Sequence, residues 1–218
     1  MSTLTTNELI NLSACQIIDL LKTHQITPIE LINVVENRIH ETDNLINATP
    51  IQCFHNARKR VEERNGEPFP PPLYGLPILV KDVHCVKGEL DTRGFLPYKD
   101  RIADENDDFV QCLVNAGGII VGKTNVPEFA AGSHTFNSIY GTTKSALDLR
   151  VSAGGSSGGS AAALAAGQCW LATGSDLGGS LRIPSCFNGV VGFRTSPGRV
   201  IKDGWKENHQ NVSNDSTP

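Results

Sequence analysis

The sequence lacks the features that would direct it to a membrane or to a nucleic acid. It contains no uninterrupted apolar run of about 18 residues, the length that a transmembrane helix needs. Residues 1–12 have neither a positive segment nor a sustained apolar stretch, so we expect no secretion signal. Lysine and arginine are dispersed and the net charge is -4, which argues against a phosphate-binding surface. We therefore expect a cytoplasmic protein with no membrane and no nucleic-acid partner.

The sequence also lacks paired cysteines. The six cysteines are Cys15, Cys53, Cys85, Cys112, Cys169 and Cys186. None of them stands in a Cys-x-x-Cys pair, the spacing typical of zinc sites and redox motifs. Most have apolar neighbours, so we expect reduced, buried thiols.

What the sequence does contain is typical of a globular protein with a sizeable core. It has 218 residues, of which 39% are hydrophobic and 19% are charged. Ser13 and Gln16 form a capping-box pattern, and Thr27, Pro28 and Glu30 supply an N-cap, a first-turn proline and an acid. Apolar residues follow both starts at helical spacing. We therefore expect two helices here and a third, with a solvated charged face, over residues 55–65.

Helices and strands are expected to alternate along the rest of the chain. Apolar runs predict strands at residues 78–80, 119–121, 169–172 and 187–193, and further segments predict helices at 107–116 and 161–166. This order predicts an α/β fold in which helices cover a buried sheet. Two glycine-rich turns lie at the ends of these elements, where such folds place active sites.

One glycine-containing segment has the spacing of a phosphate loop but not its context. Gly117 is followed after four residues by Gly122, Lys123 and Thr124. A phosphate loop needs a strand before its first glycine and a helix after the threonine. Here apolar residues fill the loop positions and Pro127 blocks the helix. We therefore expect no nucleotide binding.

The segment 154–160 admits three interpretations. It matches the Gly-x-Ser-x-Gly nucleophile elbow with Ser157 as nucleophile, but the histidine that must follow is only His209, in a polar tail. It also has the composition of a Gly/Ser linker. A linker would join separate domains, whereas here a small-residue helix and a strand follow within a few residues. We favour the third interpretation, a structured turn at an active site.

The turn at residues 174–185 has the composition of an oxyanion hole. Its consecutive glycines allow backbone N–H groups to point at one spot and to stabilise a negative oxygen. The candidate donors are Leu177, Gly178, Gly179 and Ser180. Asp176 and Arg182 flank them and either brace the turn as an ion pair or are independent surface charges.

A serine nucleophile needs a base, and Lys81 is the candidate because no histidine is convincingly placed. It follows the apolar run at 78–80, which would hold its stem in the core; a surface lysine that closes a strand is the alternative. For Lys81 to act as a base near neutral pH, its pKa must fall from about 10.4 to about 7, which costs about 4.6 kcal/mol. Burial shifts lysine pKa values by up to about 3 to 5 units, so the requirement can be met.

Four segments, in order and spacing, resemble the amidase signature family over residues 5–200. They are GLPILVKD (75–82), GKTNVPEF (122–129), GGSSGG (154–159) and GSDLGGSLRIP (174–184). The resemblance implies a mixed-sheet α/β/α fold and a small-molecule amide substrate that is cleaved without a metal or cofactor. It carries the family's catalytic triad onto Lys81, Ser156 and Ser180.

In the mechanism that this resemblance implies, Ser180 attacks the amide carbonyl and Ser156, preceded by a cis peptide in this family, passes the proton toward Lys81. The Lys81–Ser156 pair then protonates the leaving amine, and water hydrolyses the acyl-enzyme. The oxyanion hole is assigned to Leu177, Gly178 and Gly179. Structural support is expected from Gly155, Ser157, Asp176 and Arg182.

Members of this family are substantially longer, so we expect this chain to be truncated at its C-terminus. Residues 1–200 are assigned to the N-terminal part of a single amidase domain, and residues 201–218 to a polar tail that is disordered or out of context. The missing part would supply more sheet and much of the pocket. We therefore expect uncovered sheet edge and apolar surface, which favour a partner: a missing C-terminal half or a second copy.

Three functions remain open. The first is hydrolysis of small or aliphatic amides. The second is that of the glutamine-hydrolysing A subunit of a tRNA-dependent amidotransferase, which shares the same motifs. The third is that of a truncated, non-catalytic remnant that acts as an interaction module. The motifs do not identify the substrate, because the walls of the pocket select it.

Overall fold

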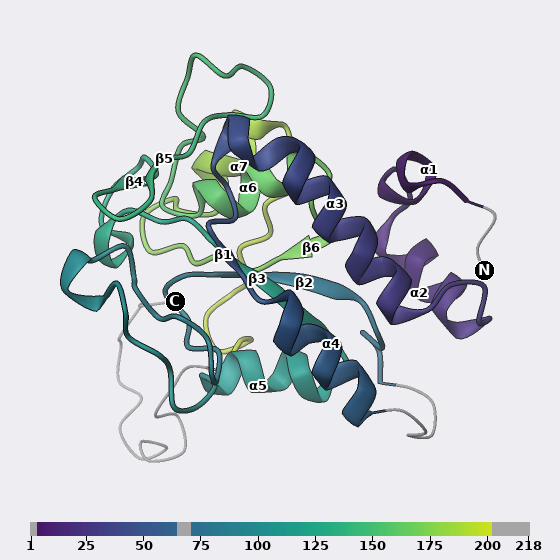
Figure 1. Ribbon diagram of the computed structural model, residues 1–218. Coiled ribbons are helices and arrows are strands. Elements are labelled where there is room, and N and C mark those ends of the chain that lie inside the picture. The colour runs from purple at the N-terminus through teal and green to yellow at the C-terminus, as the bar shows by residue number, and fades with distance from the viewer. Residues whose placement is uncertain (1–3, 65–70, 202–218) are drawn as a thin grey trace.

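The computed structural model describes residues 4–64 and 71–201, which form a mixed sheet with helices on both faces (Figure 1). The strand order is β1-β3-β2-β6. The strands are β1 (Ile51–Gln52), β2 (Pro77–Lys81), β3 (Ile119–Thr124) and β6 (Leu171–Ala172). β1 is antiparallel to β3, whereas β2 is parallel to both β3 and β6. The predicted α/β fold with a mixed sheet is thus confirmed.

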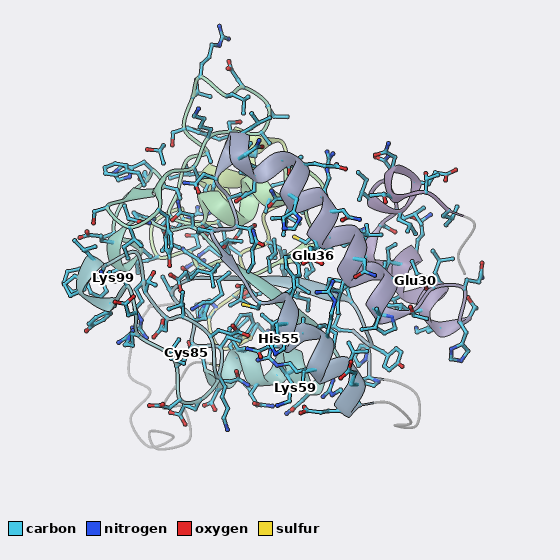
Figure 2. The ribbon with its side chains drawn as sticks, viewed as in Figure 1. Glu30, Glu36, His55, Lys59, Cys85 and Lys99 are labelled. Carbon is cyan, nitrogen blue, oxygen red and sulfur yellow. The ribbon has the colours of Figure 1, made fainter. Side chains whose placement is uncertain are left out.

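The helices begin where the sequence predicts them when a local cap is present. The α-helices of the described residues are α1 (Thr6–Ile10), α2 (Ala14–Lys22), α3 (Pro28–Ile46), α4 (Phe54–Glu63), α5 (Asp108–Asn115), α6 (Gly158–Ala165) and α7 (Arg182–Asn188). Ser13 and Thr27 cap α2 and α3 in complete capping boxes, as predicted. α4 carries the exposed residues His55 and Lys59 (Figure 2), so its solvated face is confirmed as well.

The two faces of the sheet pack against different helices. On one face Leu79 and Val121 are buried together with residues of α3, α4 and α6. On the other face Ile78 and Ile120 pack against Val110 of α5. In the view of Figure 1, α5 lies below the strands, and α6 and α7 lie above them. The sheet is therefore covered on both sides, which explains why its strands are apolar without alternation.

A short pair of strands and two 3-10 turns complete the described elements. β4 (Phe136–Asn137) and β5 (Gly141–Thr142) pair antiparallel outside the main sheet. The 3-10 turns are Leu96–Tyr98 and Glu128–Ala130. They lie in the long connections that follow β2 and β3, so these connections carry little regular structure.

The strand predicted at residues 187–193 is wrong. Residues Arg182–Asn188 form α7, and the segment after it has no strand in the structure. Pro184 is compatible with the first turn of a helix, and Gly189, at φ 64°, ends it in the left-handed region. These two local signals outweigh the apolar run that suggested a strand.

Other expectations need smaller corrections. α1 was not predicted from the sequence, although Thr5 and Glu8 form a capping box at its start. All six cysteines are free, but Cys15, Cys112 and Cys186 are exposed, so the expectation of burial is wrong for these three. Within the described ranges no helix has the length and apolar character that crossing a bilayer requires. Residues 202–218 of the predicted tail lie outside the described residues.

Candidate active site

Lys81 is the last residue of β2, and its side chain is fully buried. The apolar strand before it extends into the core, and the Lys81 backbone N–H donates to Thr173 Oγ1 at 2.9 Å. The Lys81 carbonyl accepts from the amides of Val83 and His84 as the chain turns away. The amine donates to Ser156 Oγ at 2.7 Å and to Ser175 Oγ at 2.8 Å. Hydrogen bonds therefore fix the backbone of Lys81, and two hydroxyls orient its amine.

The surroundings of Lys81 favour its neutral form. Burial lowers the pKa of Lys81 to about 7, and the negative charge of Asp176 opposes this effect only in part. Lys81 forms no ion pair with any residue that the structure describes. A lysine in this state is able to accept a proton near neutral pH.

Ser156 lies in the first glycine turn, at residues 154–159, and the Gly155–Ser156 peptide bond is cis. The turn is packed so closely that a Cβ at Gly155 or Gly159 would overlap backbone atoms. A Cβ on Gly155 would lie 2.2 Å from the backbone oxygen of His134, and one on Gly159 would lie 2.4 Å from the backbone nitrogen of Asn125. α6 begins inside this turn, three residues earlier than predicted, at Gly158.

The second glycine turn is organised around the carboxylate of Asp176. This side chain accepts from the amides of Gly179 at 2.7 Å and Leu181 at 3.2 Å, and it pairs with Arg182 Nε at 3.0 Å. Hydrogen bonds from Arg182 and from these amides hold the pKa of Asp176 well below its usual range. Asp176 and Arg182 therefore form the ion pair that the sequence left as one of two interpretations.

The two glycine turns are joined by hydrogen bonds. The Ser157 amide donates to the Ser180 carbonyl at 3.1 Å. Ser157 Oγ accepts from the Ser175 amide at 3.2 Å and lies 3.3 Å from the Ser175 carbonyl. These bonds place Ser180 next to the turn that carries Ser156. Among the described residues, the hydroxyl of Ser180 itself has no hydrogen-bond partner, so its bond to Ser156 is not formed in this structure.

The candidate oxyanion donors differ in their availability. Leu177 and Gly178 are exposed, and the Leu177 side chain is 70% accessible. The Gly179 amide, in contrast, donates to Asp176 Oδ1. The same glycine was expected to serve the oxyanion hole, so the carboxylate that braces the turn occupies one of its predicted donors.

Sequence reasoning missed two hydroxyls at this site. Ser175 is the second acceptor of the Lys81 amine, and Thr173 accepts from the Lys81 backbone. Thr173 directly follows β6, a predicted strand, and Ser175 comes two residues later, in the predicted glycine turn. Their position at the end of a strand was therefore a usable signal, but the contact with β2 was not visible in the sequence.

A cavity of about 850 Å³ adjoins the site and has the size of a small-molecule pocket. Its lining includes Ser157, Ser175 and Asp176, which are polar residues from the two glycine turns. Apolar residues such as Trp170 and Phe193 line other parts. The described residues contain no cluster of three or more His, Cys, Asp or Glu side chains able to hold a metal.

Comparisons with known proteins point to one family. The family model described as Amidase matches residues 30–217. The A subunit of a glutamyl-tRNA(Gln) amidotransferase from Prochlorococcus marinus is 42% identical over 185 residues, which are 83% of this chain and 38% of that protein. This chain thus spans about two fifths of the length of the curated relatives it matches.

Two solved structures show the same fold. One, described as an amidase, is 37% identical with a TM-score of 0.79, over 88% of this chain and 45% of that chain. The other, 6-aminohexanoate cyclic dimer hydrolase, is 33% identical with a TM-score of 0.77, over 83% of this chain and 37% of that chain.

Proposed function

The chain belongs to the amidase family, and from this premise we propose that it carries the acylation site of an amide-bond hydrolase. Lys81 is the base, Ser156 the proton relay and Ser180 the nucleophile. The observation that carries this proposal is the 2.7 Å hydrogen bond between Lys81 Nζ and Ser156 Oγ, formed by a lysine whose pKa burial lowers to about 7.

The reaction begins with attack on the amide carbonyl. Ser180 Oγ adds to the carbonyl carbon as its proton passes to Ser156 Oγ, and the Ser156 proton passes to the Lys81 amine. For this step the Ser180 hydroxyl must approach Ser156. We assign stabilisation of the oxyanion to the backbone N–H groups of Leu177 and Gly178, both of which are exposed residues. Gly179 joins them only when its amide leaves Asp176.

The second half of the reaction reverses the proton path. The Lys81–Ser156 pair returns a proton to the leaving nitrogen, the carbon–nitrogen bond breaks, and an acyl-enzyme remains on Ser180. Water then hydrolyses the ester. Ser157, Asp176 and Arg182 keep the two turns in place through the hydrogen bonds described above. The proposed chemistry uses no metal or cofactor.

A second candidate function is that of the glutamine-hydrolysing component of an amidotransferase. The 42% identity to the A subunit of a glutamyl-tRNA(Gln) amidotransferase favours it. Both functions use the same acylation site, so they differ in substrate and partner. Release of ammonia from glutamine that occurs only after partner subunits are added would support the amidotransferase function.

We also propose that further polypeptide completes the pocket. Val191 and Phe193 beside the cavity are 91% and 78% exposed. In the described part of the chain β6 has a strand neighbour on one side only. A partner that pairs with this edge and covers the apolar residues would be a second polypeptide of the amidase domain or a second copy of this chain.

The catalytic proposal is tested by intact-mass analysis after treatment with a fluorophosphonate. We expect one adduct on the wild-type chain, none on Ser180→Ala and strongly reduced labelling of Lys81→Ala. Circular dichroism confirms that the variants are folded. A folded wild-type chain that takes up no adduct would instead support the non-catalytic interaction module, and labelling of Ser180→Ala would show that another residue reacts.

A further inference from the structure

Lys123 is a second fully buried lysine, and the proposed reaction does not use it. It belongs to the segment with phosphate-loop spacing, but the structure places residues 119–124 in β3, so this loop does not exist. The Lys123 amine lies 2.5 Å from Asp82 Oδ1 and donates to the Leu90 carbonyl at 2.7 Å. Since desolvating both charges is costly, this pair needs an explanation beyond stability.

The ion pair lies on the opposite face of the sheet from the Lys81 amine. The ladder pairs Val80 with Lys123 and Lys81 with Thr124, and paired residues share a face. Successive residues of a strand point to opposite faces. Asp82, which directly follows Lys81, therefore points to the side of Lys123. The register shift between Ile78 and Leu79 brings Lys123 to this side.

Asp82 is fixed from three directions. In addition to Lys123, its carboxylate accepts from Thr92 Oγ1 at 2.5 Å, and its backbone N–H donates to the Thr124 carbonyl at 3.1 Å. β2 ends at Lys81, and the chain turns at once through Val83. Beyond Lys81 the pairing of β2 with β3 ends, and the Asp82 backbone N–H makes its last bond, to the Thr124 carbonyl. The side chain of Asp82 can hold the orientation of Lys81, because rotating Asp82 would also rotate Lys81.

We propose that the Lys123–Asp82 ion pair positions Lys81 by anchoring the end of β2 from the opposite face of the sheet. This inference rests on the proposed function of Lys81 as base. It assigns Lys123 and Asp82 as positioning residues, because neither contacts the hydroxyls of the site. If the ion pair only stabilised the fold, a hydrophobic pair that keeps the stability would leave Lys81 in place. If the ion pair positions Lys81, such a hydrophobic pair should leave Lys81 poorly placed.

The test replaces both charges together in the variant Asp82→Leu/Lys123→Met. Hydrophobic residues of similar volume often replace a buried ion pair without loss of stability. We expect this variant to unfold at a denaturant concentration close to that of the wild type. We also expect its fluorophosphonate labelling at Ser180 to be about 10- to 100-fold slower, the cost of a misplaced catalytic group.

A second readout follows Lys81 directly. The 15Nζ resonance of Lys81, titrated by NMR, should have its midpoint near the pKa of about 7 in the wild type. In the double variant the midpoint should rise toward the ordinary value of 10.5 as the amine leaves its buried position. Asp176, the charged group that acts on Lys81, and the hydroxyls of Ser156 and Ser175 are the same in both proteins.

A matched control applies the same kind of change to an exposed ion pair. Lys59 and Glu63 of α4 lie 3.8 Å apart and are 66% and 62% exposed (Figure 2 labels Lys59). Lys59→Met/Glu63→Leu should leave stability, labelling rate and the Lys81 titration unchanged. Wild-type labelling and an unshifted titration in Asp82→Leu/Lys123→Met would overturn the inference.

The inference remains testable if the double variant does not fold or if the wild type is not labelled. If the double variant does not fold, Thr92→Val replaces it, because this change removes the hydroxyl that donates to Asp82 and accepts from the Gly94 backbone N–H but leaves both charges in place. We then expect slower labelling and a raised Lys81 midpoint, and wild-type values for both would overturn the inference. If the folded wild type is not labelled, the proposed function fails, whereas the NMR titration still decides whether the ion pair positions Lys81.

Discussion

At the scale of single residues, Lys81 and Lys123 are alike in burial and opposite in surroundings. Both are fully buried near the ends of neighbouring strands. Lys123 faces the carboxylate of Asp82, whereas the Lys81 amine faces two hydroxyls. A carboxylate stabilises the charged form of a lysine, and a hydroxyl in a desolvated place does so much less. The choice of partner therefore separates a lysine held in an ion pair from the proposed base.

The pKa of Lys81 predicts how reactivity depends on pH. Only the neutral amine accepts a proton, so the rate of fluorophosphonate labelling at Ser180 should rise as pH passes through about 7 and then level off. Labelling rates measured from about pH 5.5 to about pH 9, an interval that spans the Lys81 pKa of about 7, check this expectation. A rate that does not vary with pH would contradict the role of Lys81.

The same pKa predicts a change in stability. In the unfolded chain Lys81 keeps its proton up to about its ordinary pKa of 10.5, whereas in the folded chain it loses the proton near 7. Between these values the unfolded state binds more protons, so stability rises with pH, by at most about 1.4 kcal/mol per pH unit. Urea unfolding of the wild type and of Lys81→Met at pH 7, 8 and 9 measures this dependence of stability on pH.

The expected result is a free-energy difference between wild type and Lys81→Met that shifts in favour of the wild type as pH rises. The variant provides the control, because it retains every other titrating group. A difference that is constant over this range would show that Lys81 is equally protonated in the folded and unfolded states.

At the scale of elements, the close packing of α6 against its neighbours leads to a further prediction. Alanine normally favours a helix over glycine by about 1 kcal/mol. At Gly159, however, a Cβ would lie 2.4 Å from the backbone nitrogen of Asn125. We expect Gly159→Ala to lower the free energy of unfolding by about 1 to 3 kcal/mol, the cost of overpacking.

Gly178→Ala is the matched control for this change, because no atom lies within 4 Å of the position of its added Cβ. Its free energy of unfolding should stay within about 0.5 kcal/mol of the wild type. Thermal or urea unfolding of both variants measures the contrast. Equal effects of the two substitutions would contradict the close approach of α6 to the segment after β3.

Elements with local signals were predictable from the sequence, and those without were not. The capping boxes at Ser13 and Thr27 involve residues three positions apart, so the starts of α2 and α3 could be predicted. The strand predicted at residues 187–193 is wrong because the apolar run was given more weight than Pro184 and Gly189, the local signals of a helix and of its end. Val191 in this run is in fact 91% exposed.

In the candidate site, too, the features with local signals were predictable and the contacts between distant residues were not. Lys81 and the two glycine turns could be recognised by composition and position. The Lys81–Ser175 bond joins residues 94 positions apart, and no local pattern predicts which hydroxyl meets the amine. The sequence also suggested that Gly179 serves the oxyanion hole and that Asp176 braces the turn, but one N–H cannot serve both at once.

At the scale of the whole molecule, the exposed apolar residues beside the cavity predict association. If a second copy covers this face, Phe193→Asp should reduce self-association of the purified chain, because Phe193 is 78% exposed. Its thermal stability should change little, since exposed substitutions usually alter the free energy of unfolding by less than about 0.5 kcal/mol. Sedimentation velocity at several protein concentrations measures association.

Leu45→Asp is the control, because Leu45 of α3 is 52% exposed and does not line the cavity. It should leave association unchanged. If both variants associate as the wild type does, this face does not bind a second copy, and the proposed partner must be a different polypeptide.

The hydrogen bonds of Ser157 to both Ser175 and Ser180 have a mechanical consequence. They hold the two glycine turns together, so we expect Ser156 and Ser180, the proposed relay and nucleophile, to be displaced together by thermal fluctuations. Lys81 reaches these turns from β2, and its amine meets them through side-chain hydrogen bonds to Ser156 and Ser175. Gradual loosening of the protein should therefore disconnect the proton acceptor first, and reactivity should fade at temperatures where the molecule is still folded.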